Sequence, residues 1–127
     1  MQNNRVEISG AAAIAGDVYG GGSDNGVVTN NTVNLNGGTV NGIVNGGAST
    51  SGAVTNNTVN VNGGTVGSDI IGGYSNGVVT NNTVNLNSGQ VGGDVFGSES
   101  DSGAATGNTV NLNGVMTFGL RAPRTTR

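Results

Sequence analysis

The side chains of this chain that could do chemistry are carboxylates, amides and hydroxyls. The 127 residues include no His and no Cys, and all four basic residues are Arg. The usual general bases and activated nucleophiles are therefore missing. Seven Asp and Glu remain, and paired carboxylates can hydrolyse glycosides. Because these acids are few and most adjoin glycine in expected turns, we expect no catalytic residues, no bound cofactor and no enzymatic activity.

Three aspartates share one position of an internal repeat. Asp17, Asp69 and Asp94 occupy it, and Ile43 interrupts the series. Carboxylates stacked at the strand spacing of ~4.8 Å repel unless a cation or water lies between them. Calcium prefers oxygen ligands, but the repeated Gly-Gly-x-Gly-x-Asp unit of calcium-binding β-rolls is absent, and residues 21–24 resemble it only once. We expect a solvated acidic edge and no metal site.

Asparagine and threonine form the second candidate set, and they belong to the repeat itself. Asn-Asn-Thr-Val-Asn-Leu-Asn-Gly-Gly-Thr-Val at 30–40 returns at 56–66 and, diverged, at 81–91. A shortened copy spans 108–114 and a diverged one spans 4–10, which gives a period of 25–27 residues. The outward positions form a Thr/Asn face, the predicted binding or ladder surface. Its members are Thr32, Asn34, Asn36, Thr58, Asn60, Asn62, Thr83, Asn85, Asn87, Thr109, Asn111 and Asn113.

Short strands must position this face. Val33 and Leu35 alternate with polar residues, as in a half-buried strand, and glycine at 37–38 ends it. Val28 and Val33 are an odd number of residues apart, so one straight strand would place them on opposite sides. A bend at Asn30–Asn31 removes the conflict, since asparagine tolerates the left-handed region.

Alignment of the copies predicts the fold class. It is all-β, a parallel β-helix (β-solenoid) of about five coils of 25–27 residues, with three or so short strands per coil. Stacked coils bury one another's apolar side chains, and the interior has room for Val, Ile and Leu but little else. The inward columns are Val6, Val33, Val59, Val84 and Val110; Ile8, Leu35, Val61, Leu86 and Leu112; Ile14, Val40, Val66 and Val91; and Val18, Val44, Ile70 and Val95.

A helical fold is excluded, because no apolar face recurs at helical spacing. Two alternatives to the solenoid are antiparallel hairpins and disorder. Asn-Gly at 25–26, 41–42 and 76–77 is a turn signal for antiparallel hairpins, but hairpins leave the repeat unexplained. The abundance of Gly, Ser and Asn favours disorder, but a net charge of only -3 and regularly spaced Val and Leu oppose it.

Two regions are predicted: a β-solenoid repeat domain at 1–114 and a C-terminal cap or basic tail at 115–127. Arg121, Arg124 and Arg127 crowd the tail, yet the repeats contain only Arg5, so no nucleic-acid footprint is expected. No apolar run reaches the ~18 residues of a membrane span. No export signal precedes the repeats, and we expect the chain to be a fragment of a longer exported protein.

The repeat units, followed by Gly-Asp-Val-Tyr-Gly-Gly or Ser-Asp-Ile-Ile-Gly-Gly-Tyr-Ser, resemble those of bacterial autotransporter passengers and related large surface adhesins. The resemblance covers residues 3 to about 114. It implies a right-handed parallel β-helix at the cell surface that acts as a stalk or adhesive surface. The partners would then be host-surface or glycan ligands, or further copies of the chain.

Three functions remain open at this point. The first is a non-enzymatic structural or adhesive segment of a bacterial cell-surface or secreted protein. The second is a self-assembling extracellular fibre, because an uncapped solenoid end is an unpaired edge; residues 11–14 and 115–118 are candidate caps or joining surfaces. The third is ice binding, since ice-binding solenoids resemble this chain but rank Thr-x-Thr along one face. The simplest role of the Thr/Asn face is an amide-to-amide ladder between coils.

Overall fold

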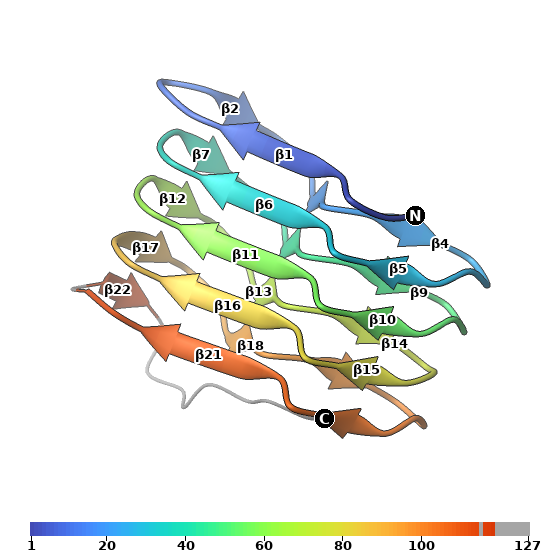
Figure 1. The fold of residues 1–127 in the computed structure, drawn as a ribbon. Helices are drawn as coiled ribbons and strands as arrows, with labels where there is room; N and C mark the ends of the chain where they lie inside the picture. The colour runs from blue at the N-terminus through green and yellow to red at the C-terminus, as the bar shows by residue number, and fades with distance from the viewer. Residues whose placement is uncertain (115, 119–127) are drawn as a thin grey trace.

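In the computed structural model the chain is a β-solenoid of stacked parallel coils (Figure 1). The structure describes residues 1–114 and 116–118, and over these residues every regular element is a strand. Five parallel sheets run along the stack. Each of the first four coils contributes one strand to every sheet in turn, and the described part of the fifth contributes to two of them. None of the described residues belongs to a helix with the length and apolarity needed to cross a bilayer.

The sheets are lettered A to E. Sheet B holds the longest strands: β1 (Arg5–Ile8), β6 (Thr32–Leu35), β11 (Thr58–Val61), β16 (Thr83–Leu86) and β21 (Thr109–Leu112). Sheet C holds β2 (Ala13–Ile14), β7 (Thr39–Val40), β12 (Thr65–Val66), β17 (Gly89–Val91) and β22 (Met116–Phe118). Sheet D holds β3 (Val18–Tyr19), β8 (Val44–Asn45), β13 (Ile70–Ile71) and β18 (Val95–Phe96).

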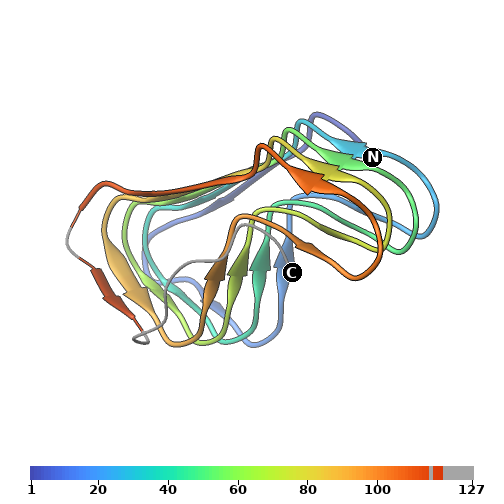
Figure 2. The ribbon, with the colours of Figure 1, turned by 90° about the horizontal axis from the view of Figure 1, so that it is seen from below.

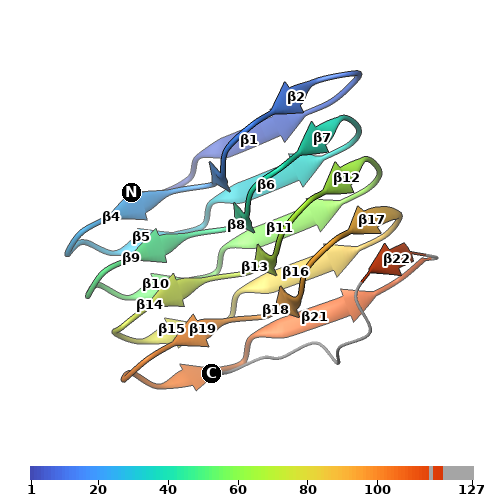
Figure 3. The same ribbon diagram turned by 180° about the vertical axis from the view of Figure 1, so that it is seen from behind.

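The two remaining sheets form an arm of the coil. Sheet E holds β4 (Gly22–Ser23), β9 (Ala48–Ser49), β14 (Tyr74–Ser75) and β19 (Glu99–Ser100). Sheet A holds β5 (Val28–Thr29), β10 (Val54–Thr55), β15 (Val79–Thr80) and β20 (Ala105–Thr106). Figure 3 shows sheets C, D and E from behind.

The strand register confirms the predicted fold class and all four apolar columns. Val33 lies between Val6 and Val59, and Leu35 lies between Ile8 and Val61. The column that contains Ile14 and Val40 is aligned along sheet C, and the column that contains Val18 and Val44 is aligned along sheet D. Every strand pairing of the described residues is parallel, so the hairpin alternative is wrong.

The number of strands per coil differs from the prediction: five rather than three or so. The prediction missed strands in the arm, because the strands of sheets E and A are only two residues long and carry few apolar side chains. β9 consists of Ala48 and Ser49 only, so no apolar alternation marks it in the sequence.

The interior has two lobes, visible when the coils are seen end-on (Figure 2). Sheets B, C and D enclose the larger apolar core, to which the four predicted columns belong. Val28, Val54 and Val79 of sheet A form a second, smaller core. Opposite them in the arm, buried Ser75 donates to the carbonyl of Gly52 over 2.6 Å.

The predicted bend at each Asn-Asn pair is confirmed. Asn30, Asn56 and Asn81 each have φ 57°, a left-handed conformation that asparagine adopts at low cost. Glycine takes the same role in the last copy, where Gly107 has φ 68°. The bend turns the chain from sheet A to sheet B and points the second asparagine of each pair inward.

At the C-terminal side, β22 pairs with β17 and carries sheet C beyond residue 114. One residue of the predicted 115–118 cap, 115, lies outside the described residues, as do 119–127 with the three tail arginines.

Candidate functional site

The predicted Thr/Asn face lies on sheet B, whose strands are seen in Figure 1, and on the residues that directly follow these strands. The register places its Thr32, Thr58, Thr83 and Thr109 in one row, and its two sets of asparagines in two more. In the first set, Nδ2 of Asn60 donates to Oδ1 of Asn34 over 2.8 Å. The same bond continues through Asn85 and Asn111. The predicted amide ladder is therefore confirmed.

The second outward row, of Asn36, Asn62, Asn87 and Asn113, is also a ladder, with Nδ2–Oδ1 distances of 2.7–2.8 Å. An amide has two N–H donors and one oxygen acceptor with two lone pairs, so a ladder uses half of that capacity. The remainder faces solvent, because this row is exposed. The face can both hold coils together and present a regular set of donors and acceptors.

Charge ends these ladders at the first coil. Glu7 stands where Asn34 stands in the next coil, and its carboxylate accepts a bond from Asn36 Nδ2 over 3.4 Å. Arg5 stands beside Thr32 and pairs with Glu7 at 2.9 Å. Charged side chains on a terminal strand oppose pairing with another chain.

A further ladder, inside the solenoid, was not predicted. The inner asparagine ladder consists of Asn31, Asn57, Asn82 and Asn108, which are buried between the two lobes. The Oδ1 of Asn57 accepts the backbone N–H of Asn31 at 3.0 Å and Nδ2 of Asn31 at 2.9 Å. The Nδ2 of Asn57 donates to Asn82 Oδ1 at 3.0 Å and to the carbonyl of Val28 at 3.1 Å. The expectation that the interior holds Val, Ile and Leu but little else is therefore incomplete, because a row of asparagines is buried there as well.

The inner asparagine ladder is tolerated because its amides are fully bonded. Asn57 uses two donors and accepts twice, which is the complete capacity of a carboxamide. A buried polar network is stable when every member is satisfied. The recurring second asparagine of each Asn-Asn pair was the available sequence signal, since its column is as regular as those of the apolar residues.

The aspartate column lies on the outside of the coils, where Asp17 is exposed and Asp69 and Asp94 are half-buried, and two of its members bond to the next coil. Oδ1 of Asp17 accepts the backbone N–H of Ile43, and Oδ1 of Asp69 accepts that of Asp94, each at 2.8 Å. These two bonds tie one coil to the next. Among the described residues no group of three or more metal-ligating acids comes together.

A concave groove lies where sheets D and E meet, and the sequence did not predict it. In Figure 2 the coils turn sharply between these sheets. A pair of glycines makes this turn in three coils, at 20–21, 46–47 and 72–73. A Cβ at Gly46 would collide with the carbonyl oxygen of Gly72 in the next coil, and one at Gly47 would lie 2.8 Å from Asn57 Cγ. Glycine thus lets the backbone approach the inner ladder in these three coils, and the fourth coil has Gly97 and Ser98 at the same place.

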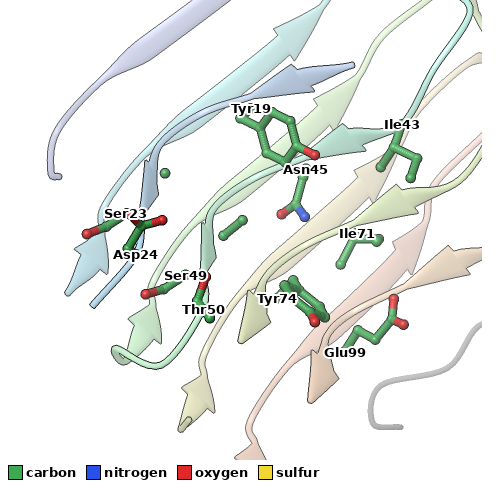
Figure 4. A pocket seen from close by; sticks show the side chains of 12 residues that line it. Tyr19, Ser23, Asp24, Ile43, Asn45, Ser49, Thr50, Ile71, Tyr74 and Glu99 are labelled. Carbon is green, nitrogen blue, oxygen red and sulfur yellow. The ribbon is translucent and has the colours of Figure 1, made fainter. Parts of the chain in front are cut away.

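The groove has a volume of about 650 Å³, within the range of small-molecule sites. Figure 4 shows Tyr19, Asn45 and Tyr74 around it, with Ile71 beside them. Ile71 is almost fully buried but belongs to neither core, because it faces away from Ile70. The missed signal was the position of the aromatic residues: Tyr19, Tyr74 and Phe96 all lie next to a glycine turn between sheets D and E.

The polar groups of the groove are mostly acceptors. Asp24 and Glu99 bring carboxylates to its edges, and Thr50 brings a hydroxyl (Figure 4). Burial, and then the neighbouring Asp17 carboxylate, raise the pKa of Tyr19 above its ordinary value, so this phenol is protonated at neutral pH. None of the described residues that line the groove is basic.

One amide donor opens on the groove. Asn45 is only 3% exposed, and its Oδ1 accepts the backbone N–H of Gly47 at 3.1 Å. Its Nδ2 has no hydrogen-bond partner among the described residues. Asn45 Nδ2 is not among the buried side-chain atoms that lack a partner, so it is open to water in the groove, and a ligand acceptor could replace that water. The groove thus combines aromatic faces, acceptors and one oriented donor.

Comparison with protein-family models, with curated proteins and with solved structures gives no match, so what is established for this chain is its architecture: a β-solenoid repeat protein with asparagine ladders.

Proposed function

We propose that this chain is a non-enzymatic, structural and adhesive segment of a bacterial cell-surface or secreted protein. The observation that carries the proposal is the continuous register of five sheets along one axis, supported by two outer ladders and one inner ladder. Backbone and side-chain bonds between coils run along this axis, so the segment resists extension and can be lengthened by adding coils. The resemblance of the repeats to autotransporter passengers and surface adhesins supports the location.

Exposure on the cell surface is the first test. An antibody raised against the purified chain should label intact cells of the source bacterium, and external protease should remove the label. Labelling only after the cells are permeabilised would contradict the proposed location.

Adhesion is tested separately, with beads that carry the purified chain. They should be retained on arrays of host matrix proteins and glycans more strongly than beads that carry a solenoid of unrelated sequence. Equal retention would reduce the proposed role to that of a spacer.

A self-assembling fibre is the second candidate, and one observation favours it. Leu112, in the last strand of sheet B, is 57% exposed, although its column is fully buried at Leu35 and Leu86. An apolar strand edge can add another chain. The Arg5–Glu7 pair on β1 opposes joining at the opposite end. Electron microscopy of concentrated protein decides: filaments support this role, and monodisperse particles exclude it.

Ice binding by the Thr/Asn face is the third candidate and stays a prediction. The row of threonines and the two outer ladders are regularly spaced, which is the property such a face needs. Thermal hysteresis of the wild-type chain and of a Thr58→Tyr variant tests it. Activity that the bulky side chain abolishes would support the role, and no activity at millimolar protein would end it.

A further inference from the structure

We propose that the concave groove between sheets D and E is a binding site for a neutral oligosaccharide, with Tyr19 and Tyr74 as stacking platforms and Asn45 as the orienting donor. This inference rests on the proposed adhesive role and adds to it a site and a ligand class. The outer ladders do not contribute to it, because sheet B does not line the groove.

Aromatic placement is the first step of the argument. The chain has four aromatic residues, and two of them, Tyr19 and Tyr74, line this one groove. Tyr19 is 47% exposed, so part of its ring is open to a ligand. The negative face of an aromatic ring attracts the C–H groups of a sugar, which are partly positive, and the phenol adds a hydrogen bond at the rim.

Spacing fits a chain of sugars better than a single ring. Tyr19 lies in β3 and Tyr74 in β14, two coils apart. At the spacing of adjacent strands this separation is about 10 Å along the axis. The two rings come from different walls of the groove, sheets D and E, with Asn45 between them in Figure 4. A ligand that touches both must run along the groove.

Hydrogen-bonding capacity selects a polyhydroxylated ligand. Asn45 Nδ2 is a donor held in place by the bond from Gly47 N–H to its Oδ1. The carboxylates of Asp24 and Glu99 and the hydroxyl of Thr50 are acceptors around it. A sugar ring presents several hydroxyls, each both donor and acceptor, next to an apolar face. That combination matches a site made of aromatic, amide and carboxylate groups.

Charge decides which sugars fit. The groove has two acids and, among its described lining residues, no base. An anionic ligand such as a sulfated or uronic-acid polymer would be repelled without a cation to pair it. A basic peptide would pair with the acids, but it lacks the closely spaced hydroxyls and the flat C–H face that match the acceptors and the two rings. A neutral oligosaccharide is therefore the ligand that the groups favour together.

The test is calorimetric titration of the purified chain with cellotetraose, mannotetraose, galactotetraose, tetra-N-acetylchitotetraose and xylotetraose. At least one should bind with a millimolar or lower Kd. Tyr19→Ser and Tyr74→Ser should each weaken binding about tenfold, as expected when a stacking platform is lost. Tyr19→Phe, which keeps the ring, should retain most of the affinity. Val78→Ser removes an exposed apolar side chain outside the groove and should leave binding unchanged.

Four results would overturn the site. They are no binding by any of the five sugars, equal affinity of the Tyr→Ser and Val78→Ser variants, preferential binding of heparin tetrasaccharide, and preferential binding of pentalysine. Circular dichroism spectra that match wild type show that each variant is folded. The outcome is separable from the proposed function, because surface labelling of cells does not depend on the groove.

Discussion

Replacement of Asn57 by alanine tests whether the inner asparagine ladder stabilises the fold. Its Oδ1 accepts two bonds from Asn31, which is fully buried. In the alanine variant both donors of Asn31 lose their acceptor and cannot reach water. An orphaned buried donor costs about 1–3 kcal/mol, so the free energy of unfolding should fall by about 2–6 kcal/mol.

The chain offers a matched control in Asn62. It makes the same two amide-to-amide bonds as Asn57, one as donor and one as acceptor. It lacks the bonds that the Asn57 side chain makes to the backbone of Asn31 and Val28, and it is exposed. Water replaces lost partners there, and Asn62→Ala should cost at most about 1 kcal/mol. Urea unfolding followed by circular dichroism measures both variants. If Asn57→Ala is no more destabilising than Asn62→Ala, burial does not make the loss of these hydrogen bonds costly, and the inner ladder does not stabilise the fold in the way described.

An Asn57→Asp variant adds a pH dependence with a definite sign. The carboxylate keeps an acceptor for Asn31 but places charge against Asn82 Oδ1 and the Val28 carbonyl. Burial raises the pKa of such a carboxyl in the folded state above that of the unfolded chain, about 3.9. Its destabilisation should therefore be smallest below about pH 4 and grow as the pH rises through the folded-state pKa. If the free energy of unfolding of the Asn57→Asp variant depends on pH in the same way as that of the wild type, this reasoning is refuted.

Three further predictions concern single positions. Gly93→Ala places a Cβ against Oδ1 of Asp69 and should cost about 1–3 kcal/mol in urea unfolding. Ser68 is the counterpart of Gly93 one coil earlier, and it faces Ile43 instead of an aspartate. Ser68→Ala should therefore cost at most about 0.5 kcal/mol. If both variants lose the same free energy of unfolding, the close contact of Gly93 with Asp69 is not the cause. The pKa of Tyr19 should lie above 10.0 and fall in Asp17→Asn, measured by ultraviolet difference titration; no change would remove Asp17 as a cause. Because that pKa is raised, the stability it contributes is present below pH 10 and is lost as the pH rises through the folded-state value.

Most of the fold was predictable because its information is local and repeated. Alternation of Val33 and Leu35 marks a strand, and the return of the same pattern every 25–27 residues fixes which strands lie side by side. The parity conflict before Asn30–Asn31 required a bend, and Asn30 does adopt the left-handed region. The outer amide ladders followed from the same register, since identical side chains on stacked strands must meet.

The strands of the arm were not predictable in the same way. Ala48 and Ser49 form a strand only because the coils above and below supply partners. Neither residue carries an alternating pattern that distinguishes a two-residue strand from a loop.

The sequence by itself determined the repeat, the parallel stacking and the columns of the large core. Only the tertiary structure decided that the second asparagine of each pair points inward, since one left-handed residue reverses the direction of the next side chain. It also decided the groove, because Tyr19 and Tyr74 are 55 residues apart in the numbering and belong to different walls. Their proximity depends on how sharply sheets D and E turn at the glycines, and that angle results from the packing of coil on coil.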